Sequence, residues 1–204
     1  QILAGDLFTH LSATLGRVIA SFSLAMLIGV GIGILMGSRA HWNEWLDTLV
    51  IIGLNIPALV TIILCYIWLG LGETAAILAV AINKIPMVVV TLREGARAID
   101  KDLLQVAQVY RLSSLQRFWR VYWPQLYPYL FAAARNGLAL IWKIVLVVEL
   151  LGRSNGIGFQ LGNYFYYFDI KGILAYTFAF VTLILMLEAL FLRPLEKRLN
   201  RWRE

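Results

Sequence analysis

The sequence predicts an all-α protein, a polytopic bundle of transmembrane helices that forms a single domain over residues 1–204. The first observation is composition. Of the 204 residues, 60% are hydrophobic and 15% are charged, which is too apolar for an ordinary soluble domain. The second is a series of five apolar blocks, each about 20 residues long and so long enough to cross a bilayer as a helix. The third is one polar interruption, about residues 93–128, where we expect function to be controlled.

The first apolar block covers about residues 14–37 and contains a stripe of small residues. Gly29, Gly33 and Gly37 recur at every fourth position, so they lie on one helix face and permit close approach of another helix. We expect this face to pack within the subunit, and a tight contact between two subunits is the alternative.

The second and third blocks each contain a proline. The second runs from about Trp45 to Leu69 with Pro57 near its middle, where we expect a kink because proline removes one hydrogen bond of the helix. Asn55 could have either of two roles. Its side chain could form a hydrogen bond to a backbone group that Pro57 leaves without a partner, or it could contact a substrate. The third block, about residues 73–92, contains Lys84 and Pro86.

The fourth block runs from about Tyr129 to Leu151 and the fifth from Gly172 to Leu192. The glycine-rich segment between them, residues 152–171, is too polar to span. Its aromatic run, residues 164–168, is typical of a membrane–water boundary. We therefore expect a short interfacial helix and a loop here, and about five spans in all.

Charged residues within the spans are candidates for the translocation path. Lys84 and Lys143 lie near the middle of their blocks, where a charge costs about 2.5–3.5 kcal/mol on insertion scales. One interpretation is that they present positive charge to an anionic solute. The other is an ion pair, either between Lys143 and Glu149 or with a carboxylate on another helix. For Glu149 two roles are open, which are gating one side of the path and capping the interface.

The polar interruption predicts two short helices joined by a turn. Asp100 and Asp102 stand where helix N-caps belong. Leu103, Ala107 and Tyr110 then follow at helical spacing and form a narrow apolar stripe on which we expect a partner to dock. Ser113 and Gln116 form a capping box, so a second helix begins near residue 114. The residue before Pro124 should end it.

The distribution of Lys and Arg predicts the orientation. One side of the membrane would carry Arg39 and the basic residues of the central loop and the tail, namely Arg93, Arg97, Lys101, Arg111, Arg117, Arg120, Arg193, Lys197, Arg198, Arg201 and Arg203. The opposite side has Arg153 and Lys171 in its long loop. Because positive charge marks the cytoplasmic side, we expect the central loop and the C-terminus to be cytoplasmic.

Several classes of function find no support in the sequence. It contains no phosphate-binding loop and no nucleophile elbow, so we expect no enzyme activity and no cofactor bound by this chain. Cys65 is the single cysteine, and His10 and His41 are isolated, so we expect no metal site. Trp119, Tyr122, Trp123 and Tyr127 lie beside apolar spans, which favours interfacial anchoring over stacking on nucleic acid.

The central loop resembles the coupling loop of type I ABC importer permeases. That pattern is Glu-Ala-Ala, three residues, Gly, nine residues, Ile, one residue, Leu-Pro. The chain keeps its spacing with Gln105-Val106-Ala107, then Arg111, Val121 and Trp123-Pro124. It departs from the pattern at two positions, with Gln105 in place of Glu and Arg111 in place of Gly.

The resemblance extends over almost the whole chain, from about residue 11 to residue 198. Trp68-Leu-Gly-Leu-Gly-Glu73 and Glu149-Leu-Leu-Gly-Arg-Ser-Asn-Gly-Ile-Gly158 resemble the corresponding stretches of the permeases that import nitrate, sulfonates and taurine. Permeases of this family usually carry one more N-terminal span. We expect that span to be missing from the sequence rather than from the protein.

The resemblance implies a membrane permease subunit of an ATP-driven importer in the bacterial inner membrane. Its partners would be a second permease copy, expected to form a homodimer, two ATP-binding subunits that hold ATP and Mg²⁺, and an external solute-binding protein. The residues expected to couple to the ATPase are Asp102, Leu103, Gln105, Val106, Ala107, Tyr110, Arg111, Val121 and Pro124. The solute would be a small one, expected to be an anion such as nitrate or a sulfonate.

Two alternatives are open. A secondary transporter or channel would need no ATPase, but the sequence shows no internal repeat of the kind common in such proteins. A structural subunit of a larger membrane complex would keep the fold without transport, and the departures at Gln105 and Arg111 are compatible with it.

Overall fold

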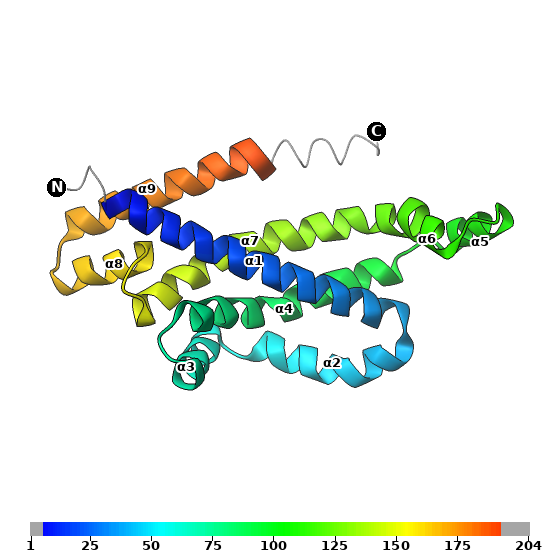
Figure 1. Cartoon of the computed structure of the whole chain (residues 1–204), viewed down its shortest axis with the longest axis horizontal. Coiled ribbons are helices and arrows are strands. Elements are labelled where there is room, and N and C mark those ends of the chain that lie inside the picture. Colours follow the sequence, from blue (N-terminus) through cyan, green and yellow to red (C-terminus); the bar gives the residue numbers. More distant parts are fainter. Residues whose placement is uncertain (1–5, 193–204) are drawn as a thin grey trace.

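The computed structural model describes residues 6–192, and these residues form helices with no strand among them. Three long helices, α1 (Asp6–Ser38), α4 (Glu73–Arg97) and α7 (Trp123–Gly152), run along the long axis of the molecule (Figure 1). The all-α bundle predicted from the sequence is confirmed. The basic tail used to predict the orientation, which begins at Arg193, lies outside the described residues.

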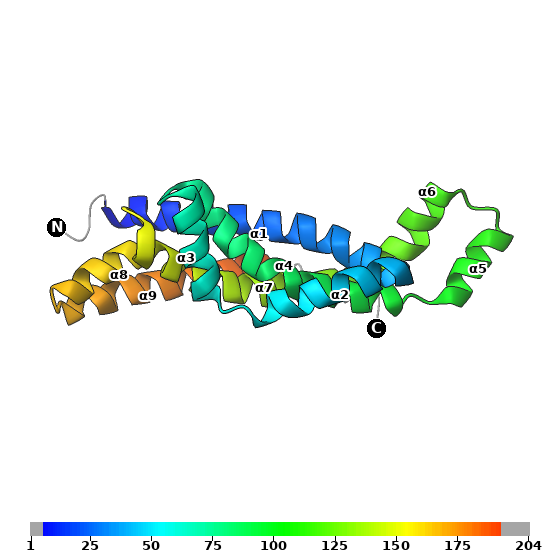
Figure 2. The same cartoon turned by 90° about the horizontal axis from the view of Figure 1, so that it is seen from below.

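The two ends of the bundle carry different short helices. At one end α5 (Lys101–Val109) and α6 (Ser114–Arg117) project beyond the long helices as a hairpin (Figure 2). At the other end lies α8 (Ile157–Tyr166), followed by α9 (Ile170–Leu187) and the π-helical turn η2 (Glu188–Leu192), which run back along the bundle. We call these the α5 end and the α8 end. The short helix expected after Gly152 is confirmed as α8.

The glycine stripe of the first span packs on α4. A Cβ atom added at Gly29 would lie 2.6 Å from the Cβ of Val88, and one at Gly33 would lie 2.7 Å from the Cβ of Leu92. At Gly37 it would lie 2.5 Å from the Cβ of Ala96. The backbones of the two helices therefore approach as closely as glycine allows. Packing within the subunit is confirmed, and the face is not free for a second copy.

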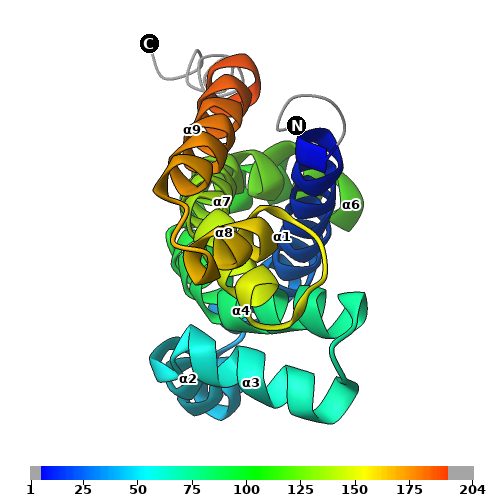
Figure 3. The ribbon, with the colours of Figure 1, turned by 90° about the vertical axis from the view of Figure 1, so that its left-hand side faces the viewer.

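The order of these contacts shows that α1 and α4 run in the same direction, because residue numbers increase together along both helices. The chain must therefore return between them. It does so through α2 (Ala40–Asn55) and α3 (Ala58–Leu69), which lie together on one side of α4 (Figure 3). Four stretches of helix are long and apolar enough to span a membrane, and the α2–α3 pair makes up to five, as predicted.

The break between α2 and α3 is sharper than the expected kink. The two helices meet at 98°, and Ile56, which precedes Pro57, has the extended backbone that a following proline favours. Asn55 donates its side-chain amide to the carbonyl of Ile51 at 2.8 Å. This contact supports the local role considered for Asn55.

The start of α5 and the start of α6 follow the predicted caps. The Asp100 side chain accepts hydrogen bonds from the backbone N–H groups of Asp102 and Leu103, so Asp100 is the N-cap and Asp102 lies in the first turn. Ser113 and Gln116 form the expected capping box, with both reciprocal bonds present. The sequence therefore located both helix starts correctly.

The prediction that the second helix ends before Pro124 is wrong. α6 continues through the π-helical turn η1 (Phe118–Tyr122) into α7, giving one helix of 39 residues over Ser114–Gly152. Pro124 lies two residues after the π turn, where the regular bonding pattern is already interrupted, so its missing N–H costs little. The side-chain amide of Gln125 donates to the carbonyl of Val121 at 3.0 Å. The span predicted from Tyr129 therefore begins earlier.

The turn after α5 explains the glycine of the family pattern. Arg111 has φ +52°, in the left-handed region that glycine adopts without cost. Its N–H donates to the carbonyl of Gln108 at 2.8 Å, and the N–H of Leu112 donates to that of Ala107 at 3.0 Å. These two bonds are the Schellman arrangement that ends many helices. The turn is thus kept although arginine replaces glycine.

We expect Gly33→Ala to destabilise the protein by roughly 1–3 kcal/mol, because the added methyl group would overlap Leu92 and the backbone of Val89. Thermal unfolding of the purified protein in detergent measures this. Gly31→Ala is the matched control on the same helix, since a Cβ there meets no atom within 4 Å. Equal melting temperatures for the two variants would contradict the α1–α4 packing.

We expect Arg111→Gly to stabilise the α5 turn by about 1 kcal/mol, because it removes the cost of a left-handed residue with a Cβ atom. Hydrogen exchange at the Arg111 and Leu112 amides should slow by several-fold. Arg111→Val should accelerate it, since a branched side chain fits this conformation worst. Faster exchange in Arg111→Gly would show that the arginine side chain itself holds the turn.

Candidate functional site

The surface of α5 has one exposed apolar face and one buried edge. The exposed face consists of Leu103, Val106, Val109 and Tyr110, which we call the coupling face. Val109 and Tyr110 are 81% and 76% exposed. Ala107, which was expected in the docking stripe with Leu103 and Tyr110, is buried within the subunit. The stripe is therefore rotated about the helix axis relative to the prediction.

The other predicted coupling residues lie around this face or at its base. Asp102, Gln105 and Arg111 are exposed on α5 and the turn after it. Val121 lies in η1 and Pro124 lies in the first turn of α7. The backbone N–H of Asp100 donates to the Gln125 side chain at 2.9 Å, so the start of α5 is tied to α7.

Aromatic rings form the base of this hairpin. Phe118, Trp119, Tyr122, Trp123 and Tyr127 are in mutual ring contact, with centroid separations of 5.5 to 6.2 Å. Large rigid rings of this kind suit a membrane–water boundary. The hairpin therefore stands on a rigid aromatic base.

Lys84 lies deep in the bundle. It is 9% exposed, and within residues 6–192 no carboxylate pairs with it. Gly95, three turns further along α4, meets the ring of Tyr129 on α7, so the α4 face that carries Lys84 is directed at α7. Lys84 also stands four residues from Val80 and from Val88, which belong to two separate apolar clusters. It therefore occupies the level between them.

The four residues predicted for the translocation path differ in how far they are buried. Lys143 is exposed on α7, Asn55 is exposed at the α2–α3 break, and Glu149 is fully buried at the α8 end. None of the other three is among the hydrogen-bond or ion-pair partners of Glu149. The ion pair considered between Lys143 and Glu149 is not formed.

The partner of Glu149 is Arg17, which the sequence reasoning did not single out. Nη1 of Arg17 donates to Oε1 of Glu149 at 2.7 Å, and Arg17 is only 4% exposed. The other carboxylate oxygen accepts from the hydroxyl of Thr14 at 3.0 Å and from the N–H of Gly158 at 2.9 Å. An arginine inside an apolar block was the available signal, because such a residue needs a buried partner.

Glu73 joins the same group. It accepts from Nε and Nη2 of Arg17 at 2.8 and 2.5 Å and from Nη2 of Arg153 at 2.7 Å. We call Arg17, Glu73, Glu149 and Arg153 the charge cluster. It has two positive and two negative members, drawn from α1, α4, α7 and the loop after α7. Glu73 is the first residue of α4.

The glycines of the loop after α7 are required by this cluster. A Cβ atom at Gly156 would lie 2.3 to 2.5 Å from the carboxylate of Glu149, and Gly156 has φ +112°. One at Gly158 would lie 2.1 Å from the carbonyl of Leu146. Only glycine lets the loop backbone close over the buried carboxylate. The Gly-Ile-Gly motif is thus explained by close approach.

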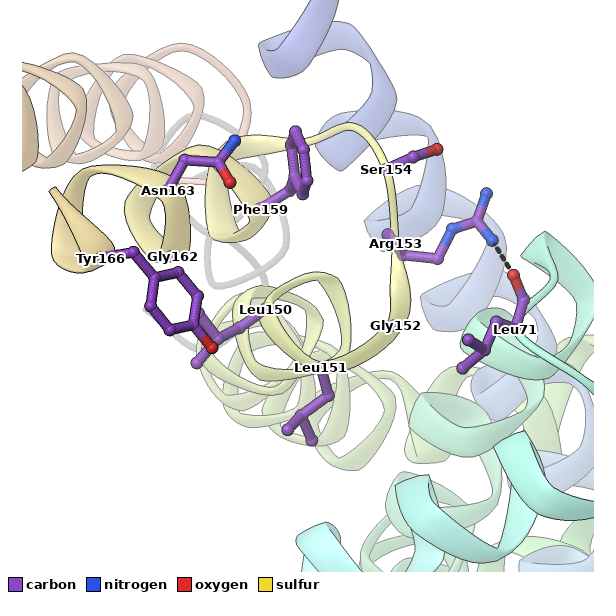
Figure 4. Close-up of a pocket in the computed structure, with 10 residues that line it drawn as sticks. All are labelled: Leu71, Leu150, Leu151, Gly152, Arg153, Ser154, Phe159, Gly162, Asn163 and Tyr166. Carbon is purple, nitrogen blue, oxygen red and sulfur yellow. Dashed lines mark hydrogen bonds between the residues drawn. The ribbon is translucent and has the colours of Figure 1, made fainter.

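The pockets on the described part of the bundle include the following two. One, of about 450 Å³, lies at the α8 end, where Leu150, Arg153, Phe159 and Tyr166 contribute to its walls (Figure 4). In Figure 4 the side chain of Arg153 extends to the carbonyl of Leu71 and donates a hydrogen bond to it. The other, of about 400 Å³, is a mainly apolar groove between α1, α7 and α9. No cluster of metal-ligating side chains occurs within residues 6–192.

Comparison with known proteins identifies the family. Residues 29–201 match the family described as "Binding-protein-dependent transport system inner membrane component". The chain is 29% identical over 196 residues to the taurine transport system permease protein of Escherichia coli, covering 96% of this chain and 71% of that protein. It is 33% identical over 147 residues to the nitrate import permease protein of Synechocystis, covering 72% of this chain and 54% of that protein.

The fold is that of solved importer structures. A chain of the MetNI methionine ABC transporter, in an inward-facing form, aligns with a TM-score of 0.83 at 18% identity, covering 96% of both chains. A chain of an amino acid ABC transporter aligns with a TM-score of 0.76 at 19% identity, covering 94% of this chain and 93% of that chain. With most of its length matched by the family and its fold shared with these importers, the chain belongs to the inner-membrane permease components of binding-protein-dependent ABC transporters.

Proposed function

We propose that this chain is the permease subunit of an ATP-driven importer that moves a small anion, and that its coupling face docks on a separate ATP-binding subunit. The observation that carries the proposal is the projecting α5, which exposes four large apolar side chains beyond the spans. Exposed apolar groups of this size mark an interaction surface. ATP and Mg²⁺ would be held by the partner subunits, of which there would be two.

The positive charges support a cytoplasmic location for the α5 end. Within the described residues, Arg39 and the basic residues from Arg93 to Arg120 lie toward this end, and Arg153 and Lys171 lie at the α8 end. Because the cytoplasmic side carries the excess of Lys and Arg, a solute-binding protein would meet the α8 end from outside. A second copy of the chain would complete the path as a homodimer.

An anionic cargo is supported by Lys84. The relatives are named for taurine, sulfonates and nitrate, which all carry negatively charged oxygen atoms. Arg17 is already neutralised by two carboxylates, so it has no charge to offer. Lys84 lies between the two apolar clusters and has no carboxylate partner within residues 6–192, so it is the group that would attract an anion. Lys143 and Asn55 would contribute from exposed positions, and Glu149 would hold the α8 end.

We expect Val109→Asp and Tyr110→Asp each to reduce ATP-driven uptake at least tenfold, because a carboxylate cannot be buried in an apolar contact without a partner. Uptake into vesicles that contain the whole transporter measures this. Gln108→Asp is the matched control, since Gln108 is exposed on the opposite side of α5 and should retain uptake within twofold. Equal losses in all three variants would remove the docking assignment.

The same vesicles test the energy source. Uptake that stops on ATP depletion and is unaffected by collapse of ion gradients is the expected result. Uptake that follows the ion gradient instead would identify a secondary transporter.

We expect Lys84→Met to lower anion uptake tenfold or more, while Lys84→Arg retains a measurable part of it because the charge is kept. Lys143→Met should have a smaller effect, since Lys143 is exposed. Initial rates over a range of nitrate, taurine and alkanesulfonate concentrations measure both KM and maximal rate. Normal anion uptake by Lys84→Met would show that Lys84 has no part in recognition.

A further inference from the structure

One guanidinium holds four segments together at the α8 end. Arg17 on α1 binds Glu73 at the start of α4 through two nitrogen atoms and Glu149 near the end of α7 through a third. It also donates to the backbone carbonyl of Asn155 at 2.9 Å and to its side-chain oxygen. Arginine alone has enough donors in a rigid plane to serve all these acceptors. The tie therefore depends on this residue.

None of these segments can separate from Arg17 independently of the others. Glu149 is fully buried, and Arg17 is its only positively charged partner within the described residues. Separating them would leave a buried carboxylate without a counter-charge, which is strongly unfavourable in an apolar surrounding. Glycine contacts at Gly156 and Gly158 further fix the loop over Glu149. The ends of α1, α4 and α7 must therefore move together.

The other end of the same long helix carries the coupling hairpin. Ser114–Gly152 is continuous over 39 residues, which makes it roughly 60 Å long at about 1.5 Å per residue. Glu149 lies near one end and Ser113 caps the other. A displacement applied at α5 can reach the α8 end along this helix, because the chain stays helical from Ser114 to Gly152, including the π-helical turn η1.

We infer that Arg17 is a positioning residue for transport. It clamps the α8 end of the long helix to α1 and α4, so that motion delivered by the ATPase tilts these spans as a unit instead of tilting α7 alone. The inference rests on the proposed function, because it assumes that the coupling face receives that motion. A clamp that serves stability alone is the competing interpretation.

The paired substitution Arg17→Met with Glu149→Gln distinguishes a role of Arg17 in transport from a role in stability alone. It removes one positive and one negative charge, keeps the shapes of both side chains approximately, and leaves Glu73 paired with Arg153 at 2.7 Å. Because no buried charge is left unpaired, the transporter should assemble and remain stable. We expect ATP-driven uptake to fall at least tenfold while ATP hydrolysis by the same complex stays within twofold.

Arg135→Met with Glu188→Gln is the matched control. It removes another ion pair between spans, at 3.8 Å and partly exposed, and should leave uptake within twofold. Spin labels on cysteines introduced at Ser12 and Ser154, both exposed, provide a second measurement. The distribution of distances between the two labels should broaden in the Arg17–Glu149 variant and not in the control. The native Cys65 is buried and should remain unlabelled.

Parent-like uptake or an unchanged distance distribution in the Arg17–Glu149 variant would overturn the inference. A stable variant that has lost both ATP hydrolysis and uptake would also overturn it, since the defect would then lie at the ATPase. If the parent complex imports no solute, the proposed function is wrong and this inference falls with it. If the parent imports and the variant imports equally, only this inference is wrong.

Discussion

The requirement that a charge buried in an apolar bundle be neutralised in place organises the α8 end of this protein. The guanidinium of Arg17 lies inside a membrane span, and Glu73 and Glu149 supply its counter-charges from two other spans. This requirement explains the arrangement of the nearby loop, whose glycines leave room for the Glu149 carboxylate. The glycine-rich stretch that the sequence marks as too polar to span thus forms a close-fitting cover over a buried charge.

Local features of the fold could be predicted from the sequence, because their causes are local. Apolar blocks of spanning length, the capping box at Ser113 and the glycine face of α1 all depend on residues within a few turns of one another. The partner of Glu149 could not be predicted in this way, since Arg17 lies 132 positions earlier. Sequence spacing suggested Lys143, which is close in the chain but exposed.

The central hairpin shows how a correct pattern can still mislead in detail. Spacing identified α5, yet the side that faces outward depends on how α5 rests on η1. α5 contacts η1, and on α5 Ala107 is buried whereas Val106 and Val109 are exposed. Pro124 predicted a helix end because the preceding residue normally avoids helical geometry. The π turn before it absorbs that conflict, so the helix continues and joins the hairpin to the spans.

The parallel packing of α1 and α4 has a consequence for how the protein is assembled during synthesis. The glycine face of α1 and the charge of Arg17 enter the membrane before either partner exists, since Glu73 follows 56 positions later and Glu149 follows 132 positions later. Arg17 therefore acquires its counter-charges in sequence, first from α4 and then from α7. The ion pairs of the charge cluster can therefore be complete only after α7 and the loop that carries Arg153 have been synthesised.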